Sequence, residues 1–299
     1  SVPRLANSGT NSPLGNAGTI FFGNAGNTTT LIYTGTGHST GRKLSMDGGG
    51  GGGIIDQSGA SGLLEFTGAV APEAAGNYTL TLKGSAGGTG EISGVISKGT
   101  GTSIAIVKDG TGTWTLSGAN TYAGATTINA GTIKLGVSST VNTAGPLGTT
   151  AAGTTVASGA SLDLNGFSLT AAATEALSIS GTGVGGLGAL TNSSATPSTY
   201  IGVITFVAAA SVVGEGGTIA ITGTPVSSAI AITLGGSAGG SISTVIAGAR
   251  TLTKEGTGTW TLSGANTFTG GVSLDAGTLN INNATALGTV AGTFVIADG

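Results

Sequence analysis

The sequence predicts an all-β protein, a β-solenoid with loop excursions. Three observations lead to this fold class: a long internal repeat, short runs in which apolar and polar residues alternate, and glycine between those runs. Alternation with a period of two indicates strands with one buried face and one wet face. The chain has 299 residues, 60 of them glycine, and many of these glycines fall in the turns between runs. We expect one continuous solenoid over residues 1–299.

The repeat is a cassette that occurs twice. Its first copy covers residues 108–135 and its second copy covers residues 254–281. The tryptophans of the two copies, Trp114 and Trp260, are 146 residues apart. A solenoid repeats in this way because each coil contacts only its neighbours. A sandwich or a barrel, the two alternatives, has no need of a copied cassette.

Fainter similarities extend the repeat beyond the cassette. The segment Gly-Ser-Ala-Gly-Gly occurs at 84–88 and again at 236–240. A Leu-Gly pair marks the same point three times, at 14–15, 147–148 and 287–288. We expect repeat units over about 13–145 and about 146–285, and the start of a third at 286–299. Coils with strands usually take about 20–29 residues, so one unit holds several coils.

The apolar residues of each cassette are expected to form the core and, within one copy, to close a single coil. They are Trp114, Leu116, Ile128, Ile133 and Leu135 in the first copy, and Trp260, Leu262, Leu274, Leu279 and Ile281 in the second. A buried aromatic side chain removes about 150–250 Å² from water. Each tryptophan is therefore interpreted as a core anchor, with sugar stacking by an exposed indole as the alternative.

Small and polar residues of the cassette are expected in its turns. Glycines fall where a positive φ or close backbone approach would exclude a β-carbon; they are Gly112, Gly118, Gly131, Gly258, Gly264 and Gly277. Asn120 and Asn266 are expected to bond the backbone and to stack in ladders between coils. The pairs Lys108-Asp109 and Lys254-Glu255 are expected on a solvated face, with a Lys–Asn isopeptide crosslink as the alternative.

The cassette resembles a known repeat family. Its pattern is Gly-x-Gly-Thr-Trp-Thr-Leu-Ser-Gly-x-Asn-Thr-Tyr/Phe-x-Gly, followed by Ala-Gly-Thr-Ile/Leu. This pattern is similar to the autotransporter-associated β-strand repeat, also called the passenger-associated transport repeat. The resemblance implies a right-handed parallel β-helix in the passenger domain of an exported bacterial surface protein. It leaves the secretion route open.

Composition argues against several classes of function. With one histidine and no cysteine, the chain is not expected to hold zinc, haem or another cofactor. Its 9 Lys and Arg residues are too thinly spread for a nucleic-acid-binding stripe. No apolar run reaches the roughly 20 residues of a membrane-spanning helix. Because the chain begins at Ser1 without a signal peptide, we expect it to come from the interior of a longer precursor.

The densest group of charged residues lies in the first quarter of the chain. It consists of His38, Arg42, Lys43, Asp47, Asp56, Glu65 and Glu73. We expect these side chains to solvate a loop-rich outgrowth, with a polysaccharide lyase that uses Glu65 and Glu73 as the alternative. Asp47 leads into six glycines, 48–53, and ordering such a run costs much entropy. Residues 36–62 are therefore expected to be a loop excursion and the first place for partner contact.

These observations predict a non-enzymatic extracellular protein, a stalk or filament segment at a bacterial surface. Its expected partners are further copies of itself or adjoining repeats, end to end. The alternative is an adhesin or passenger domain that binds surface glycans through its Thr-, Ser- and Asn-rich exterior. Ice or crystal-surface binding through Thr79/Thr81 and Thr113/Thr115 is disfavoured, because such pairs do not recur at coil spacing.

Overall fold

The computed structural model describes residues 1–299 except 8, 10, 11, 16, 24, 25, 60, 140–142, 171–174, 224–229, 290, 298 and 299. The chain divides into two compact units, Ser1–Thr154 and Thr155–Gly299. Apart from one short 3-10 helix, η1 (Val184–Gly186), the regular structure of the described residues is β-strand. The strands pair in parallel and wind through both units as β-solenoids, so the predicted fold class is confirmed.

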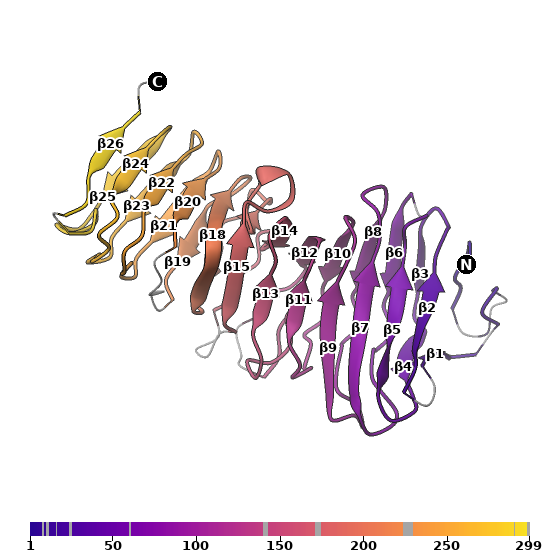
Figure 1. Cartoon of the computed structure of the whole chain (residues 1–299). Helices are drawn as coiled ribbons and strands as arrows, with labels where there is room; N and C mark the ends of the chain where they lie inside the picture. Colours follow the sequence, from indigo (N-terminus) through magenta and orange to yellow (C-terminus); the bar gives the residue numbers. More distant parts are fainter. Residues whose placement is uncertain are drawn as a thin grey trace. The chain divides into compact units, whose positions relative to one another are not determined.

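The first unit has two long lines of parallel strands, and each coil contributes one strand to each line. The first line is β2 (Thr28–Ile32), β5 (Gly51–Asp56), β7 (Asn77–Lys83), β9 (Ser103–Lys108) and β11 (Thr126–Ile128). The second line is β3 (His38–Thr40), β6 (Leu63–Phe66), β8 (Thr89–Ile92), β10 (Thr113–Leu116) and β12 (Gly131–Leu135). Figure 1 shows β2, β5, β7 and β9 side by side in this order.

A third, shorter line completes the coils of the first unit. It begins with the parallel pair β1 (Thr19–Phe22) and β4 (Lys43–Met46) and continues as single bridges from Leu44 to Val70 and from Val70 to Ile96. β13 (Thr154–Val156) lies at the boundary between the two units. Coils of the first unit are short, because register partners such as Thr113 and Thr132 are 19 residues apart and Ile54 and Thr81 are 27 apart.

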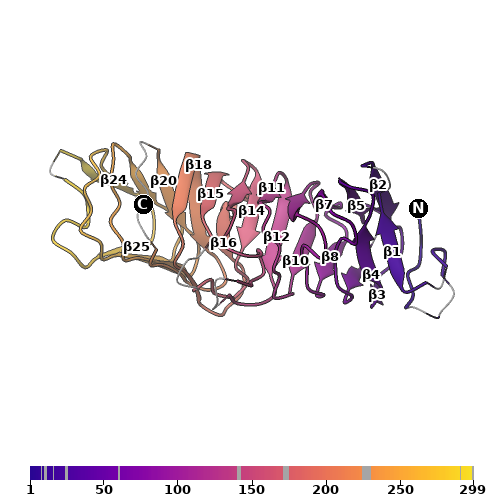
Figure 2. The same cartoon turned by 90° about the horizontal axis from the view of Figure 1, so that it is seen from below.

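The second unit is built on the same principle with different strands. Its first line is β15 (Leu177–Gly181), β18 (Ile204–Gly214), β20 (Ile232–Gly235), β22 (Leu252–Lys254), β24 (Val272–Leu274) and β26 (Phe294–Ile296). Its second line is β17 (Ser198–Tyr200), β19 (Ile219–Ile221), β21 (Gly239–Ile242), β23 (Thr259–Leu262) and β25 (Thr278–Ile281). β14 (Ala160–Asp163) pairs with β16 (Leu190–Asn192), which pairs with the end of β18. Figure 2 shows β15 beside β18.

Alternation along the strands produces the core. In β7 the side chains of Tyr78, Leu80 and Leu82 are buried and those between them are half-buried. Leu80 lies beside Ile106 of the next coil, so buried residues stack along the interior of the unit. This burial stabilises the fold by about 25 cal/mol for each Å² of apolar surface removed from water.

The glycine-rich segment is not the loop excursion that the sequence suggested. Residues 36–62 contain β3, β4 and β5, and the glycine run continues into β5 itself. A β-carbon at Gly52 would lie 2.3 Å from the carbonyl oxygen of Thr79, and one at Gly53 would lie 2.6 Å from the ring of Phe22. The glycines therefore allow neighbouring strands to approach closely, which is why this run forms ordinary coil structure.

Candidate functional site

The cassette spans parts of two successive coils. Trp114 pairs in register with Ile133, and Leu116 pairs with Leu135, because β10 and β12 belong to the same line of strands. The expectation that the five apolar residues close a single coil is therefore wrong. The chain completes one full turn of the solenoid between Trp114 and Ile133, and the cassette is the unit that joins one coil to the next.

The expected core residues of the two copies differ in burial. All five of the first copy are fully buried, as are Trp260 and Leu262 of the second. Leu274 and Leu279 are half-buried, and Ile281 is 48% exposed. Ile281 lies on β25, which is the last strand of its line in the described part of the chain, so one side of this strand is uncovered.

Each tryptophan is held by a hydrogen bond from its indole to an earlier strand end. Nε1 of Trp114 donates to the carbonyl oxygen of Lys83 at 3.0 Å, and Nε1 of Trp260 donates to that of Gly235 at 3.0 Å. Both indoles are fully buried. In this structure neither ring has a face open to a sugar, and both act as core anchors.

A glycine of the preceding coil makes room for each indole. Trp114 pairs in register with Gly90, and Trp260 pairs with Gly240. A β-carbon at Gly90 would lie 2.4 Å from Cδ2 of Trp114, and one at Gly240 would lie 2.9 Å from Cη2 of Trp260. The indole therefore lies against the backbone of the coil before it, and a larger residue at either glycine would displace it.

The cassette lysines are buried, so the expectation of a solvated face is wrong. Nζ of Lys108 donates to the carbonyl oxygens of Asp109 at 3.0 Å, Gly110 at 2.7 Å and Ala130 at 3.0 Å. Lys254 repeats the arrangement with the carbonyl oxygens of Glu255, Gly256 and Ala276 at 2.9, 2.8 and 2.9 Å. An ammonium group has three donors, and main-chain oxygens of two turns satisfy all three. The isopeptide alternative gains no support from this arrangement.

Positive φ and close approach both require a glycine beside each buried ammonium. Gly131 has a φ of 68°, and a β-carbon there would lie 2.7 Å from Nζ of Lys108. Gly277 has a φ of 72°, and a β-carbon there would lie 2.8 Å from Nζ of Lys254. Burial lowers the pKa of Lys108 to about 8, although the Asp109 carboxylate acts in the opposite direction. Burial also lowers the pKa of Lys254.

The cassette asparagines bond the backbone, as predicted, and each bridges two other turns. Asn120 accepts from the backbone N–H of Ile96 at 2.8 Å and donates to the carbonyl oxygen of Pro146 at 2.8 Å. Asn266 accepts from the N–H of Ile246 at 2.8 Å and donates to the carbonyl oxygen of Ala286 at 2.6 Å. Both side chains are buried and reach an earlier and a later segment of the chain.

The remaining turn glycines lie against the backbone of a preceding coil. A β-carbon at any of them would come within 2.6 Å of a main-chain atom. The closest atoms are Ser85 O for Gly112, Gly94 O for Gly118, Gly239 N for Gly258 and Thr244 O for Gly264. These positions therefore set how closely successive turns stack.

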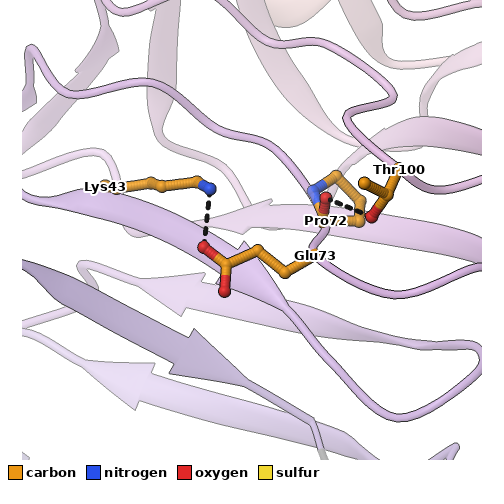
Figure 3. A network of polar contacts seen from close by, with 4 residues as sticks. All are labelled: Lys43, Pro72, Glu73 and Thr100. Atoms are coloured by element: carbon orange, nitrogen blue, oxygen red, sulfur yellow. Dashed lines mark hydrogen bonds and ion pairs between the residues drawn. The ribbon is translucent and has the colours of Figure 1, made fainter.

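The charged group of the first unit is engaged in separate local contacts. Nζ of Lys43 and Oε1 of Glu73 form an ion pair of 2.6 Å between half-exposed side chains, near a hydrogen bond of 3.2 Å from Thr100 to the carbonyl oxygen of Pro72 (Figure 3). Glu65 instead accepts from Oγ of Ser93 at 2.7 Å. The two carboxylates of the lyase alternative thus have different partners.

The other members of this group also have contacts close by. Asp56 accepts from the backbone N–H of Ser58 at 2.9 Å, and Asp47 accepts from that of Gly48 at 2.7 Å. His38 forms a short hydrogen bond with the hydroxyl of Tyr33. Within the described ranges, no three His, Asp or Glu side chains gather as a metal-binding group. The same ranges contain no helix that is both long enough and apolar enough to cross a membrane.

Sequence reasoning missed the buried lysines although a signal was present. Ile104, Ile106 and Lys108 occupy every second position of β9, which places the lysine on the inward face. The glycines that lie against the indoles could be recognised in the same way. Gly90 occupies an inward position two residues before Ile92 in β8. In both cases the period-two pattern predicts an inward position, although lysine is usually exposed and glycine is usually found in turns.

Comparisons with known proteins agree with the resemblance noted from the cassette. Residues 106–135 and 252–281 match the family model described as Passenger-associated-transport-repeat. The adhesin BmaC autotransporter of Brucella suis biovar 1 (strain 1330) is 37% identical over 142 residues, which is 46% of this chain. The match spans only 4% of the length of that adhesin. No solved structure matches the chain significantly.

Proposed function

We propose that this chain is a non-enzymatic, repeat-built segment of a protein at the outer surface of a bacterium, where it serves as a stalk or filament. One observation carries the proposal. In both cassettes the lysine, the tryptophan and the asparagine are buried and bond the backbone of other turns. These three residues, which recur 146 positions apart, thus hold coils together and do not face solvent as a ligand-binding set would.

The comparisons support the location of this function. The repeats that match residues 106–135 and 252–281 are described as passenger-associated, and the similar Brucella protein is an autotransporter adhesin. A passenger is the exported part of such a protein. The comparison therefore supports an extracellular or cell-surface location for this chain. Contacts end to end with adjoining repeats or with further copies are part of the same proposal.

Electron microscopy of the native protein tests the structural role. A stack of parallel strands about 4.8 Å apart extends along one axis with each added coil. We expect thin rods whose length grows with the number of cassettes. Compact round particles for a protein with several cassettes would contradict the proposal. Labelling of intact cells with antibodies against the chain tests its position, and a signal only after lysis would contradict a surface location.

An adhesive role is the second candidate, and the similarity to an adhesin favours it. Binding of the 299-residue chain to a glycan array is the direct test. An adhesin should bind a subset of glycans saturably, whereas a passive stalk should bind none. Excision of residues 36–62 is unsuitable as a control, because it removes β3, β4 and β5. Substitution of outward-facing residues such as Thr79 and Thr81, which leaves the strands in place, is the appropriate control.

A further inference from the structure

A groove in the second unit lies beside the second cassette and faces solvent. It has a volume of about 370 Å³ and passes between the η1 segment and the turns that follow β18, β20 and β22. Leu187, which is 51% exposed, gives the groove an apolar wall, and Val213, which is 4% exposed, also lines it. Glu215 and Glu255, which are both exposed, supply carboxylates to the same groove. We refer to it as the Glu215/Glu255 groove.

The equivalent place in the first unit holds a lysine. Leu234 pairs with Lys254 just as Leu82 pairs with Lys108, so Gly235 corresponds to Lys83. The tryptophan contacts give the same correspondence, because the two indoles donate to the carbonyl oxygens of Lys83 and Gly235. The following segment, Gly-Ser-Ala-Gly-Gly, is identical in both units. The second unit therefore lacks a side chain at the position that a lysine occupies in the first.

Both units have two acidic residues around this position, but at different places. In the first unit Lys83 is flanked in the stack by Asp56 and by Asp109, and Asp109 accepts from Nδ2 of Asn129 at 2.9 Å. In the second unit Gly235 lies between Val213 and Glu255. Ser85 and Ser237 each donate to the carbonyl oxygen of the corresponding earlier turn, which belongs to Ser58 in the first unit and to Glu215 in the second. The second unit has thus lost the lysine but keeps two carboxylates, because Val213 replaces Asp56 and Glu215 replaces Ser58.

The described residues of the second unit include no exposed cation to balance these carboxylates. In its described residues the basic side chains are Arg250 and Lys254, and both are buried. Lys254 is held by three main-chain oxygens. Glu215, Glu255 and Asp275 are exposed. Charge complementarity therefore favours a cationic partner, and the apolar wall favours one with an alkyl stem.

We propose that the Glu215/Glu255 groove binds a lysine side chain of a protein partner. The alkyl stem packs on Leu187 and Val213, over the space left by Gly235, and the ammonium lies against the carboxylates of Glu215 and Glu255. The partner's lysine would thus place a cationic side chain near the position that Lys83 occupies in the first unit. The inference does not rest on the proposed function, because neither rod shape nor glycan binding requires an occupied groove.

Nuclear magnetic resonance titration of the full chain tests the proposal. The probe is a capped Gly-Ser-Lys-Ser-Gly peptide at low ionic strength, where exposed charges are least screened. We expect saturable shifts of the backbone amide signals of Gly236, Ser237 and Gly256, and no such shifts with the same peptide carrying norleucine in place of lysine. Equal shifts with the norleucine peptide would overturn the proposal, as would saturation of the same signals by Ca²⁺ at concentrations where the lysine peptide has no effect.

Matched variants locate the site. The double variant Glu215→Gln/Glu255→Gln should lose the shifts, whereas Asp109→Asn, at the position equivalent to Glu255 in the first cassette, should keep them. Gly235→Lys should also abolish binding by supplying the missing side chain from within. A β-carbon at Gly235 has its nearest neighbours at 3.5 Å, an ordinary contact, so Gly235→Ala should fold and bind as the original chain does. Normal binding by a folded Gly235→Lys protein, or equal losses in the Asp109→Asn protein, would refute the assignment.

Discussion

At the scale of single residues, the buried lysine is the side chain that fixes each cassette turn. A buried charge is costly unless its donors are satisfied. The three carbonyl oxygens around Lys108 meet this requirement and come from two turns, at 109–110 and at 130. The lysine therefore joins one coil to the next through main-chain atoms, which makes the contact independent of the side chains at those positions.

Replacement of this lysine by methionine tests whether its hydrogen bonds to the two turns stabilise the fold. The Lys108→Met protein should be destabilised by about 1–3 kcal/mol, because buried carbonyl groups lose their donor. Lys43→Met is the control, since it removes only a half-exposed ion pair that contributes about 0–1 kcal/mol. Denaturant unfolding followed by tryptophan fluorescence measures both. Equal losses of stability in the two variants would show that the buried position of Lys108 has no special weight.

The pKa of Lys108 gives a pH dependence with a definite sign. Burial lowers this pKa from 10.5 to about 8 in the folded chain. Between these values the unfolded chain keeps a proton that the folded chain has released, so this group makes the fold more stable as pH rises from 8 to 10.5. The gain is about 1.4 kcal/mol per pH unit within that window, and it is lost again as pH falls through 8.

Comparison with the methionine variant isolates this effect. Lys108→Met has no proton to release at this position, so the gap in unfolding free energy between it and the original chain should widen with rising pH. Lys254, whose pKa is also lowered, is present in both proteins and cancels. A gap that stays constant from pH 7 to pH 11 would contradict the linkage.

At the scale of elements, residues in register on successive strands of one line have complementary sizes. β8 presents Gly90 where β10 presents Trp114, and β21 presents Gly240 where β23 presents Trp260. A small residue under a large one lets parallel strands keep their spacing of about 4.8 Å while an indole fills the interior. The glycine and the tryptophan are therefore one structural feature, shared between two coils.

A double-mutant cycle tests this pairing. Gly90→Ala should cost about 1–3 kcal/mol in the original chain, because the new methyl group overlaps the indole. Trp114→Ala should cost about 3–5 kcal/mol. In the Trp114→Ala background the added methyl group meets no ring, so Gly90→Ala should cost much less there. Gly235→Ala, whose β-carbon has ordinary contacts, is the control. Strict additivity of the two changes would rule out the proposed pairing.

At the scale of the whole molecule, stability is distributed along the chain. Each coil pairs with its neighbours, and the chain divides into units at residues 154 and 155. In such repeat proteins stability is close to a sum of terms for coils and for their interfaces. Damage at one cassette should then remain near that cassette.

Hydrogen exchange of the Trp114→Ala protein tests this locality. Backbone amides of β8 to β12 should lose protection and residues 105–140 should become sensitive to protease. Amides of β21 and β23, which surround Trp260, should keep the protection of the original chain. The reciprocal Trp260→Ala protein should show the opposite distribution. A uniform loss of protection along the chain in either variant would mean that the molecule unfolds as one cooperative unit.

The fold class and the repeat could be predicted from the sequence alone, and both tryptophans that were predicted as core anchors are buried. These follow from local rules, because period-two alternation and glycine-bounded runs specify strands wherever they occur. The register between strands of successive coils could not be predicted from the sequence. Trp114 meets Ile133 and Gly90 because of coil length, which depends on how each turn closes.

The period-two pattern of β9 marks Lys108 as inward-facing, but the partners of its ammonium group could not be predicted from the sequence. Lys108 stands next to Asp109 in the chain, and the sequence suggested an exposed charge pair. Its ammonium lies instead among main-chain oxygens, one of them contributed by Ala130 of the next turn. Backbone carbonyls are present at every residue, so their convergence on one point leaves no mark in the sequence. Only the folded chain brings them together.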